Sequence, residues 1–270
     1  MGELLSEVGK KLAERWLTAL LLPGLLIIAA AICGSVLGHR DALNFTLLAI
    51  ELQRLGNDLQ PQPAATILAI AGAFLCSTAT GFAAQALGVG VQRALVGTRP
   101  RWLVRFGHTH TEPEPPIKHA PPGTVRSPRL TSIGDRFRLM GERVNTQYGL
   151  IVTLAWPRLW LLLSDQARTP LVISHTSYRT AITMTAWGLL YIILGAIWWP
   201  AALAGMITAF VGYRRAMTTA AVFADLIESV VDIYQHALAD AVGIALPSGR
   251  LTWVEGAEIN KILNKQSQAT

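Results

Sequence analysis

Residues 180–213, with the sequence TAITMTAWGLLYIILGAIWWPAALAGMITAFVGY, decide the fold of this chain. The stretch holds no Asp, Glu, Lys or Arg, and Trp198-Trp199-Pro200 lies just past its middle. One helix needs about 20 apolar residues to cross the hydrocarbon core of a bilayer, so this stretch is too long for one upright span and slightly short for two generous ones. We predict that it is a helical hairpin that turns at Trp198-Trp199-Pro200.

The composition is that of a membrane protein. Of the 270 residues, 51% are apolar and 15% are charged, whereas a soluble domain has about 25% charged residues. Cys33 and Cys76 both fall inside apolar runs, so they do not form the disulfide framework of a secreted domain. The net charge of +6 would raise the question of nucleic acid in a soluble protein. In a membrane protein the distribution of Lys and Arg matters more, and we expect no nucleic-acid partner.

The sequence predicts an all-α fold: a polytopic membrane helical bundle with four transmembrane helices, a helical cytoplasmic region and a stalk. Long runs without charge mark the spans, and Pro, Gly and Arg clusters mark the connections between them. The predicted segments are an amphipathic amino-terminal segment 1–15, a first span 16–37, an extracytoplasmic loop 38–63 with a short helix at about 42–55, a second span 64–92, a Pro/Arg/His-rich cytoplasmic loop 93–130, cytoplasmic or interfacial helices 131–179, a third span 180–199, a fourth span 201–215, a cytoplasmic stalk helix 216–246, and a tail 247–270 with a short helix.

The distribution of Lys and Arg predicts the orientation. Three precede the first span, two lie between the first and second spans, 13 lie in residues 93–179 and five follow residue 213. Positive residues accumulate in cytoplasmic segments, so a hairpin at 180–213 places 21 of the 23 inside, with both termini cytoplasmic. The predicted location is therefore the cell membrane, and the alternative is a re-entrant or three-span form.

The last predicted span is short. Residues 201–213 make about 20 Å of helix, so Arg214 and Arg215 are expected at the inner boundary, where their guanidinium groups reach lipid head groups. Small side chains recur every four residues in two spans and let another helix approach closely, within one bundle or between subunits. These residues are Ala65, Ala69, Ala73, Ser77 and Gly81 in the second span and Ala201, Gly205 and Ala209 in the fourth.

The cytoplasmic region combines helical periodicity with boundary residues. Residues 133–147 have the spacing of a helix, and residues 148–163 read as a helix pair broken at Pro157. Trp156, Arg158 and Trp160 are expected at the membrane interface or at lipid head groups, because tryptophan prefers the water boundary. A further helix is expected to start at Thr169-Pro170.

The stalk has the most regular pattern in the chain. Phe223, Ile227, Val230, Tyr234, Leu238 and Ala241 step by three or four residues, and Asp and Glu lie largely off that seam. The seam either packs on the helices of residues 133–163, with the acidic side balancing their arginines, or joins subunits. After the stalk, Thr252 and Glu255 make a capping box for a small helix that ends at Leu263.

No pattern in the sequence indicates a reaction. The sequence lacks a glycine-rich phosphate loop, a Cys-x-x-Cys pair, a His-Glu-x-x-His helix and a Gly-x-Ser-x-Gly elbow. His108, His110, Glu112 and Glu114 lie in a proline-broken stretch, and we interpret them as part of a solvated loop, with a metal site as the alternative. We therefore predict a protein that is not an enzyme and has no cofactor or metal.

Trp156-Pro157-Arg158-Leu159-Trp160 and Tyr213-Arg214-Arg215-Ala216 resemble stretches in a group of uncharacterised four-span membrane proteins of high-GC Gram-positive bacteria. The resemblance carries no named activity. We expect an oligomeric membrane component, namely an anchor, scaffold or membrane-perturbing effector of a bacterial signalling or defence system. Its expected partners are anionic membrane lipids, further copies of the chain and a cytoplasmic protein at the stalk. An oligomeric channel or transporter is the alternative.

Overall fold

The computed structural model describes residues 6–7, 21–59, 63–96 and 132–264. Within this part of the chain the secondary structure is helical throughout, without strands, so the all-α prediction is confirmed there. Most of the predicted segment 1–15, residues 16–20 of the predicted first span, most of the loop 93–130 and the end of the tail lie outside the described residues. The described helices are α2 (Leu22–Leu37), α3 (Phe45–Leu59), α4 (Pro63–Val96), α6 (Ser132–Tyr148), α7 (Val152–Leu162), α8 (Asp165–Leu194), α9 (Trp199–Val242) and α10 (Trp253–Leu263).

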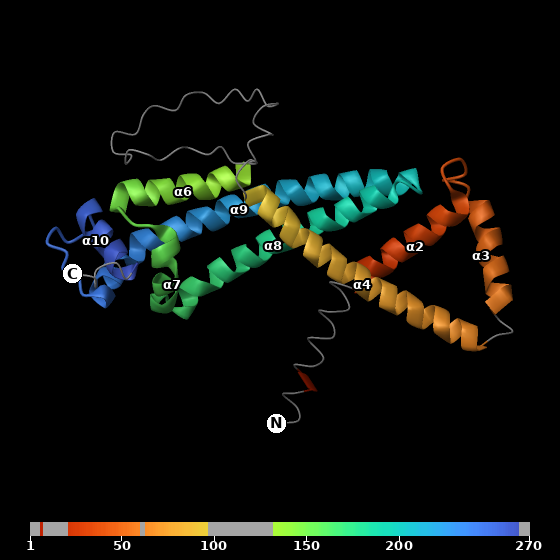
Figure 1. Ribbon diagram of the computed structural model, residues 1–270, viewed down its shortest axis with the longest axis horizontal. Helices are drawn as coiled ribbons and strands as arrows, with labels where there is room; N and C mark the ends of the chain where they lie inside the picture. Colours follow the sequence, from red (N-terminus) through yellow and green to blue (C-terminus); the bar gives the residue numbers. More distant parts are fainter. Residues whose placement is uncertain (1–5, 8–20, 60–62, 97–131, 265–270) are drawn as a thin grey trace, which may run out of the picture. The chain divides into compact units, whose positions relative to one another are not determined.

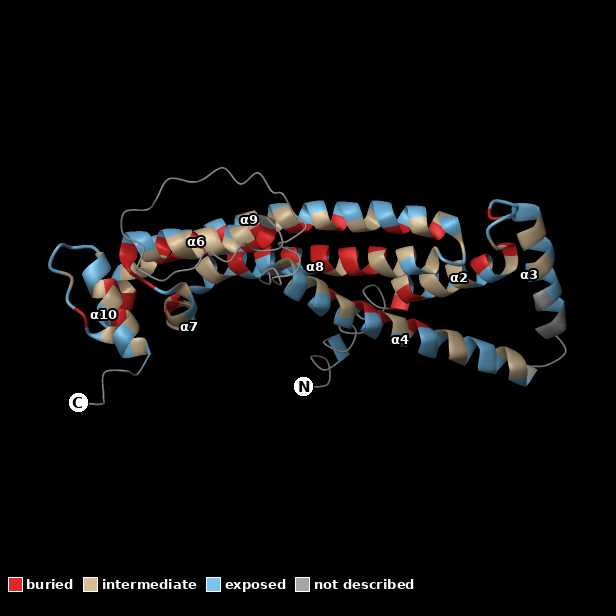
Figure 2. Cartoon of the chain, turned by 45° about the horizontal axis from the view of Figure 1, so that its top comes forward, coloured by how far each residue is buried: buried red, intermediate tan, exposed pale blue. Residues whose placement is uncertain are grey.

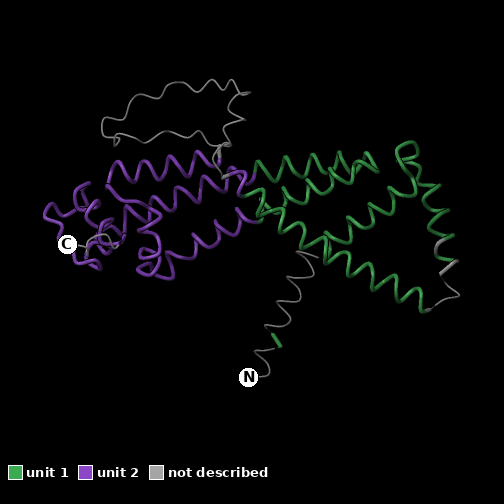
Figure 3. The backbone as a smooth tube through the Cα atoms, viewed as in Figure 1, with its two compact units in different colours: residues 1–92, 180–214 green, residues 93–179, 215–270 purple. Residues whose placement is uncertain are grey.

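The chain divides into two compact units (Figure 3). Unit 1 comprises residues 1–92 and 180–214, and unit 2 comprises residues 93–179 and 215–270. Helices α8 and α9 contribute to both units, because the boundaries fall at residues 179/180 and 214/215 within them. These boundaries lie within one residue of the points where the sequence predicts a change from membrane span to cytoplasmic region.

The hairpin is present in unit 1, but its turn lies earlier than predicted. Helix α8 ends at Leu194, residues 195–198 form the turn, and α9 begins at Trp199. The predicted spans 180–199 and 201–215 are therefore wrong at the corner. Pro200 lies in the first turn of α9, where a missing N–H breaks no helical hydrogen bond, so it starts the second helix rather than making the turn.

The two helices of the hairpin approach at glycines. A Cβ atom on Gly188 would overlap the backbone of Ala209, one on Gly205 would lie 2.6 Å from the Ile192 nitrogen, and one on Gly212 would lie 2.7 Å from the Thr185 nitrogen. Such distances are shorter than any van der Waals contact, so only hydrogen fits at these positions. The small residues of the sequence therefore set the spacing of α8 and α9 within unit 1.

Helices α2, α3 and α4 form the rest of unit 1 (Figure 1). Ser77 of α4 is buried and donates a hydrogen bond to the Leu21 carbonyl at 2.7 Å, beside Gly24 of α2. At the other end of α2, the loop to α3 contacts the hairpin turn: His39 Nδ1 lies 2.7 Å from the Ile197 carbonyl, and Trp198 Nε1 donates to the Ala42 carbonyl at 3.0 Å.

Helix α3 is longer at its carboxyl end than the predicted 42–55. The side chain of Asn44 accepts a hydrogen bond from the Leu47 N–H at 3.1 Å, which starts the helix at Phe45. The helix passes through the exposed Gly56 and Asn57 and continues to Leu59. A single glycine in an exposed helix costs only about 1 kcal/mol, so it does not force an end.

By length and composition, one described helix could cross a membrane, the stretch Ala64–Leu95 of α4, and Leu22–Leu37 is a shorter apolar helix. In the hairpin, the uncharged parts of α8 and α9 are residues 180–194 and 199–213, each about 22 Å long. Both continue into the polar parts of the same helices. The four spans therefore stay a prediction.

Unit 2 has an apolar core built from α6, α7, α10 and the parts of α8 and α9 that belong to it. Leu150, Leu159, Leu238 and Ile259 are completely buried in it. Helix α9 ends at Gly243, whose φ of +80° favours glycine, and the Ile244 N–H returns to the Ala239 carbonyl at 2.9 Å. This terminates the stalk and turns the chain back toward α10.

Two predictions about helix ends in unit 2 are wrong. The predicted helix pair in residues 148–163 is a single helix, α7 (Val152–Leu162), with Pro157 inside it. Helix α8 starts at Asp165 instead of Thr169, with Pro170 inside it. Each proline lies in the second turn of its helix and is exposed, as is the residue four positions before it, so water can bond the carbonyl group that the proline leaves unpaired.

Candidate functional site

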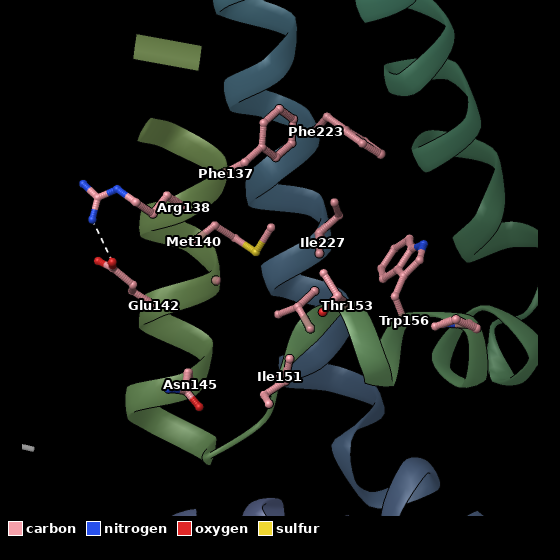
Figure 4. Close-up of a pocket in the computed structure, with 13 residues that line it drawn as sticks. Phe137, Arg138, Met140, Glu142, Asn145, Ile151, Thr153, Trp156, Phe223 and Ile227 are labelled. Atoms are coloured by element: carbon pink, nitrogen blue, oxygen red, sulfur yellow. Dashed lines mark hydrogen bonds and ion pairs between the residues drawn. The ribbon is translucent and has the colours of Figure 1, made fainter. Parts of the chain in front are cut away.

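The candidate site is a groove in unit 2 between α6 and α7, with α9 as its floor (Figure 4). Its volume is about 760 Å³, within the range of about 300–1,000 Å³ that is usual for ligand pockets. Most of its lining is apolar or aromatic. The lining residues are Phe137, Arg138, Met140, Gly141, Glu142 and Asn145 of α6, Ile151, Val152, Thr153, Trp156 and Pro157 at α7, and Phe223 and Ile227 of α9.

Helical periodicity places these side chains in the groove. Phe137 and Met140 are three residues apart on α6, and Phe223 and Ile227 are four residues apart on α9, so each pair lies on one helix face. The rings of Phe137 and Phe223 meet edge to face, with centroids 6.1 Å apart. This aromatic contact closes one end of the groove and fixes the spacing of α6 and α9 there.

A second hollow, of about 560 Å³, lies on the α8 side of Trp156. It is lined by Trp156, Pro157, Trp160, Leu171, Val172, His175 and Phe223. Trp156, Pro157 and Phe223 are shared with the first groove, so one set of apolar side chains separates two hollows. The His175 ring packs on Phe223 with centroids 5.4 Å apart.

The charged rim of the groove is paired within α6. Arg138 donates to Glu142 at 2.7 Å and lies 3.5 Å from Asp135. Burial alone lowers the pKa of Arg138, but the hydrogen bond and charge of Glu142, together with Asp135, outweigh it and raise the pKa. One guanidinium group between two carboxylates leaves this rim with a net charge of about −1, so it has no surplus positive charge to offer an anionic ligand.

Polar contacts also join α6 to the stalk part of α9. The Tyr148 hydroxyl donates to Asp232 at 2.7 Å, and Arg143 pairs with Glu228 at 2.9 Å. Burial, together with the hydrogen bond to Asp232 and the charge of that carboxylate, raises the pKa of Tyr148 to about 12. The phenol is therefore neutral at all physiological pH values and remains a hydrogen-bond donor to the carboxylate.

The turn between α6 and α7 is held by α10. Gly149 has a φ of +65°, and a Cβ atom there would overlap the Trp253 carbonyl; one on Gly256 would overlap the Tyr148 carbonyl. The Asn260 amide donates to the Gly149 carbonyl at 2.6 Å and accepts from the Ile151 N–H at 3.0 Å. The tail helix thus fixes the turn from which one wall of the groove starts.

The predicted interface residues of α7 are half-buried. The Trp156 and Trp160 rings lie 6.1 Å apart, and the Arg168 guanidinium lies 5.9 Å from the Trp160 ring. Arg158 donates to the Leu154 carbonyl at 3.0 Å. Arg214 and Arg215 are exposed on α9. These positions neither require nor contradict lipid contact, which stays a prediction.

The structure places most of the predicted stalk seam in the core of unit 2. Ile227, Val230 and Leu238 are buried in it, Phe223 and Tyr234 pack against it, and Ala241 is exposed. In the described part of the chain, the seam packs on α6 and α7, as the first of the two interpretations predicted, and Glu228 pairs with Arg143 of α6. The upper seam residues Phe223 and Ile227 also line the groove.

The small-residue stripes are only partly buried. On α4, Ser77 and Gly81 are buried and the buried line continues to Ala84 and Gly88, whereas Ala65 and Ala73 are half-buried and Ala69 is exposed. A Cβ atom on Gly88 would lie 3.9 Å from Ala186 of α8, an ordinary contact. On α9, Ala201 and Gly205 are buried and Ala209 is half-buried against Gly188.

Within the described residues no group of three His, Cys, Asp or Glu side chains is placed to hold a metal ion. The sequence reasoning missed Gly149, Gly256 and Asn260, because a glycine or asparagine that contacts a distant helix has no local pattern. No protein-family model matches the chain, and no curated protein or solved structure matches it.

Proposed function

We propose that the protein is a four-span integral membrane anchor, in which unit 1 lies in the bilayer and unit 2 is a cytoplasmic interaction unit. The observation that carries this proposal is that unit 1 exposes large apolar side chains along α4 and α9 while small residues line the contacts between its helices, whereas unit 2 has an apolar core that includes large side chains. In lipid, large apolar residues face outward and small residues make the helix contacts, whereas in water the large apolar residues form the core.

Unit 1 has the pattern expected in lipid. On α4, Leu68 and Leu75 are 75% and 72% exposed, while Ser77 and Gly81 are buried. On α9, Phe210 is 64% exposed and Gly205 is buried. Figure 2 shows the exposed positions of this part of α9 on the side away from α8. Exposed apolar surface of this extent is rare in soluble monomers and is expected at a membrane-facing surface.

Unit 2 has the pattern expected in water. Its core buries large apolar residues such as Leu159 and Leu238, although Leu161 and Ile233 are exposed, and charged side chains such as those of Arg138 and Arg143 form ion pairs. A unit with this pattern gains nothing from lipid around all its faces. We therefore assign it to the aqueous side, and the accumulation of Lys and Arg in residues 93–179 makes that side cytoplasmic.

The hydrogen bonds at the hairpin turn support four spans. The loop after α2 bonds the turn between α8 and α9 through His39 and Trp198, so both connections lie at the same end of unit 1. That end is the outer side if the amino terminus is cytoplasmic. A three-span arrangement would instead need residues 180–213 to form a single helix.

In this proposal the groove of unit 2 is where the predicted stalk partner binds, since Phe223 and Ile227 of the stalk line it. Anionic-lipid binding and homo-oligomerisation stay predictions of the sequence. The channel alternative predicts ion conductance by the purified protein in planar bilayers, whereas the anchor predicts none.

Thiol labelling tests the topology. In a background with Cys33→Ala and Cys76→Ala, single cysteines replace the exposed Gln53 of α3 and Asp240 of α9. With a membrane-impermeant maleimide, we expect Gln53→Cys to react in intact cells and Asp240→Cys to react only in inverted vesicles. Reaction of both in intact cells would establish three spans, and release of the protein from membranes by alkaline carbonate would rule out the anchor.

A further inference from the structure

Helix α3 has an apolar face that the described residues of unit 1 leave largely uncovered, with Leu48 half-buried on it. Phe45, Leu48 and Leu52 recur at helical spacing on one face, while Gln53 and Asn57 lie on the other side. Phe45 is 73% exposed and Leu52 is 48% exposed. Ile50, also exposed, lies outside this face. A surface helix of a water-soluble domain would bury such a face, so α3 has an unaccounted apolar surface.

Two hydrogen bonds in unit 1 place the start of α3 beside the turn of the α8–α9 hairpin. Trp198 bonds the Ala42 carbonyl and His39 bonds the Ile197 carbonyl, so the start of α3 lies beside the tip of the α8–α9 hairpin. That tip carries Trp198 and Trp199, and tryptophan is enriched at the boundary between membrane and water. The start of α3 therefore lies at the boundary, if unit 1 spans the bilayer.

The direction of α3 also fits a boundary position. In Figure 1, α3 joins the ends of α2 and α4 and runs across the direction of the α8–α9 hairpin. A helix that lies across spanning helices runs along the membrane plane. The large exposed apolar residues of α4 begin at Ile67, eight residues after α3 ends at Leu59.

We propose that α3 is an interfacial helix that lies in the outer leaflet of the bilayer, with Phe45, Leu48 and Leu52 inserted among the lipids and Gln53 and Asn57 facing water. This inference rests on the proposed membrane location of unit 1. Such helices insert their apolar face about 5–10 Å below the head groups. The insertion braces the outer ends of α2 and α4 and ties the hairpin tip to the surface.

The charge of α3 indicates what holds it there. The helix carries Glu51, Arg54 and Asp58, a net charge of about −1, and Arg54 lies 3.9 Å from Glu51. It therefore has no positive face to attract anionic head groups. Burial of apolar side chains must supply the binding free energy, and insertion should not depend on anionic lipid.

Spin labelling in vesicles tests the inference. Single cysteines at Phe45, Leu52, Gln53 and Asn57 are labelled with a nitroxide in the background that lacks Cys33 and Cys76, and the protein is reconstituted into phosphatidylcholine. Power saturation compares collisions with oxygen, which concentrates in lipid, and with a water-soluble nickel chelate. Leu75→Cys on α4 serves as the control for a lipid-facing position. All five side chains are exposed in the structure, so the labels leave the core packing unchanged.

We expect Phe45→Cys and Leu52→Cys to report a depth of about 5–10 Å and Gln53→Cys and Asn57→Cys to report water. If Leu75→Cys reports lipid while all four α3 positions report water, the inference fails and the anchor stands. If Leu75→Cys reports water, both fail. Depths that appear only when phosphatidylglycerol is added would overturn apolar insertion as the cause.

Discussion

The side-chain amide of Asn260 makes two hydrogen bonds to the backbone of a distant turn: it donates to the Gly149 carbonyl at 2.6 Å and accepts from the Ile151 N–H at 3.0 Å. Asn260→Ala would leave both backbone groups without these partners at the joint of α10 with α6 and α7. Loss of a partner for a partly buried polar group costs about 1–3 kcal/mol. We expect faster hydrogen exchange in α10 and around Gly149, with little change in unit 1.

The matched control for this prediction is Lys261→Ala. Lys261 follows Asn260 on the same helix and is exposed, and surface substitutions usually change stability by less than about 0.5 kcal/mol. Equal exchange rates in α10 for the two variants would show that the amide contacts do not hold the tail helix.

Gly256 permits the close approach of α10 to the turn after α6. Its α-carbon faces the Tyr148 carbonyl so closely that an added methyl group would overlap the oxygen atom. We expect Gly256→Ala to push α10 off the turn and expose the α10–α7 contact to protease. Gly141→Ala in α6 is the control, because nothing lies within 4 Å of a Cβ atom there, and alanine favours a helix over glycine by about 1 kcal/mol. Similar protease resistance of both variants would contradict this account.

Local patterns in the sequence predicted local structure well. The capping box of Thr252 and Glu255 is confirmed, because both partners lie within one helical turn. The hairpin was predicted from the length of the uncharged run, but its turn was misplaced because Pro200 was given the role of a corner. Pro157 was interpreted as a break and Pro170 as a helix start, yet both lie inside a helix near its exposed start, where a lost hydrogen bond can be replaced by water.

The candidate site was much less predictable. Trp156 was singled out from the sequence as an interface residue, and Phe223 and Ile227 as part of a seam that packs on the helices of residues 133–163 or joins subunits, but the groove that they share was not predicted. Their common groove depends on which faces of α6, α7 and α9 meet, and this depends on contacts between residues far apart in the chain, such as Tyr148 with Asp232. Periodicity shows that a face is apolar without showing what covers it.

Tyr148 makes the stability of unit 2 sensitive to alkaline pH. Burial and the hydrogen bond to Asp232 raise the pKa of Tyr148 to about 12, above the value of about 10 in an unfolded chain. Between these values the folded state binds more protons than the unfolded state, so the free energy of unfolding falls as the pH rises from about 10 to about 12. The stabilising effect of the raised pKa is fully present below pH 10.

The difference in tyrosinate absorbance between the native sequence and Tyr148→Phe measures this pKa directly, since it cancels the other tyrosines. Asp232→Asn keeps an acceptor for the hydroxyl but removes the negative charge, so we expect the pKa of Tyr148 to fall toward 10 while remaining above it because of burial. An unshifted pKa near 10 in the native sequence would contradict the buried contact.

The α8–α9 hairpin depends on glycines in the same way as the α10 joint. A Cβ atom on Gly188 would overlap the Ala209 backbone, and one on Gly205 would lie only 2.6 Å from the Ile192 nitrogen. Without hydrophobic driving force between helices in lipid, close packing must hold the pair together, so separation by one methyl group removes much of the contact energy. We expect Gly188→Ala and Gly205→Ala to lower the temperature at which unit 1 loses its fold in detergent, and their double variant to add little because both force the same separation.

The control is Gly72→Ala on α4, where a Cβ atom would meet nothing within 4 Å and the helix should be at least as stable as before. An unfolding temperature that is unchanged in both single variants would show that the helices can approach without these glycines.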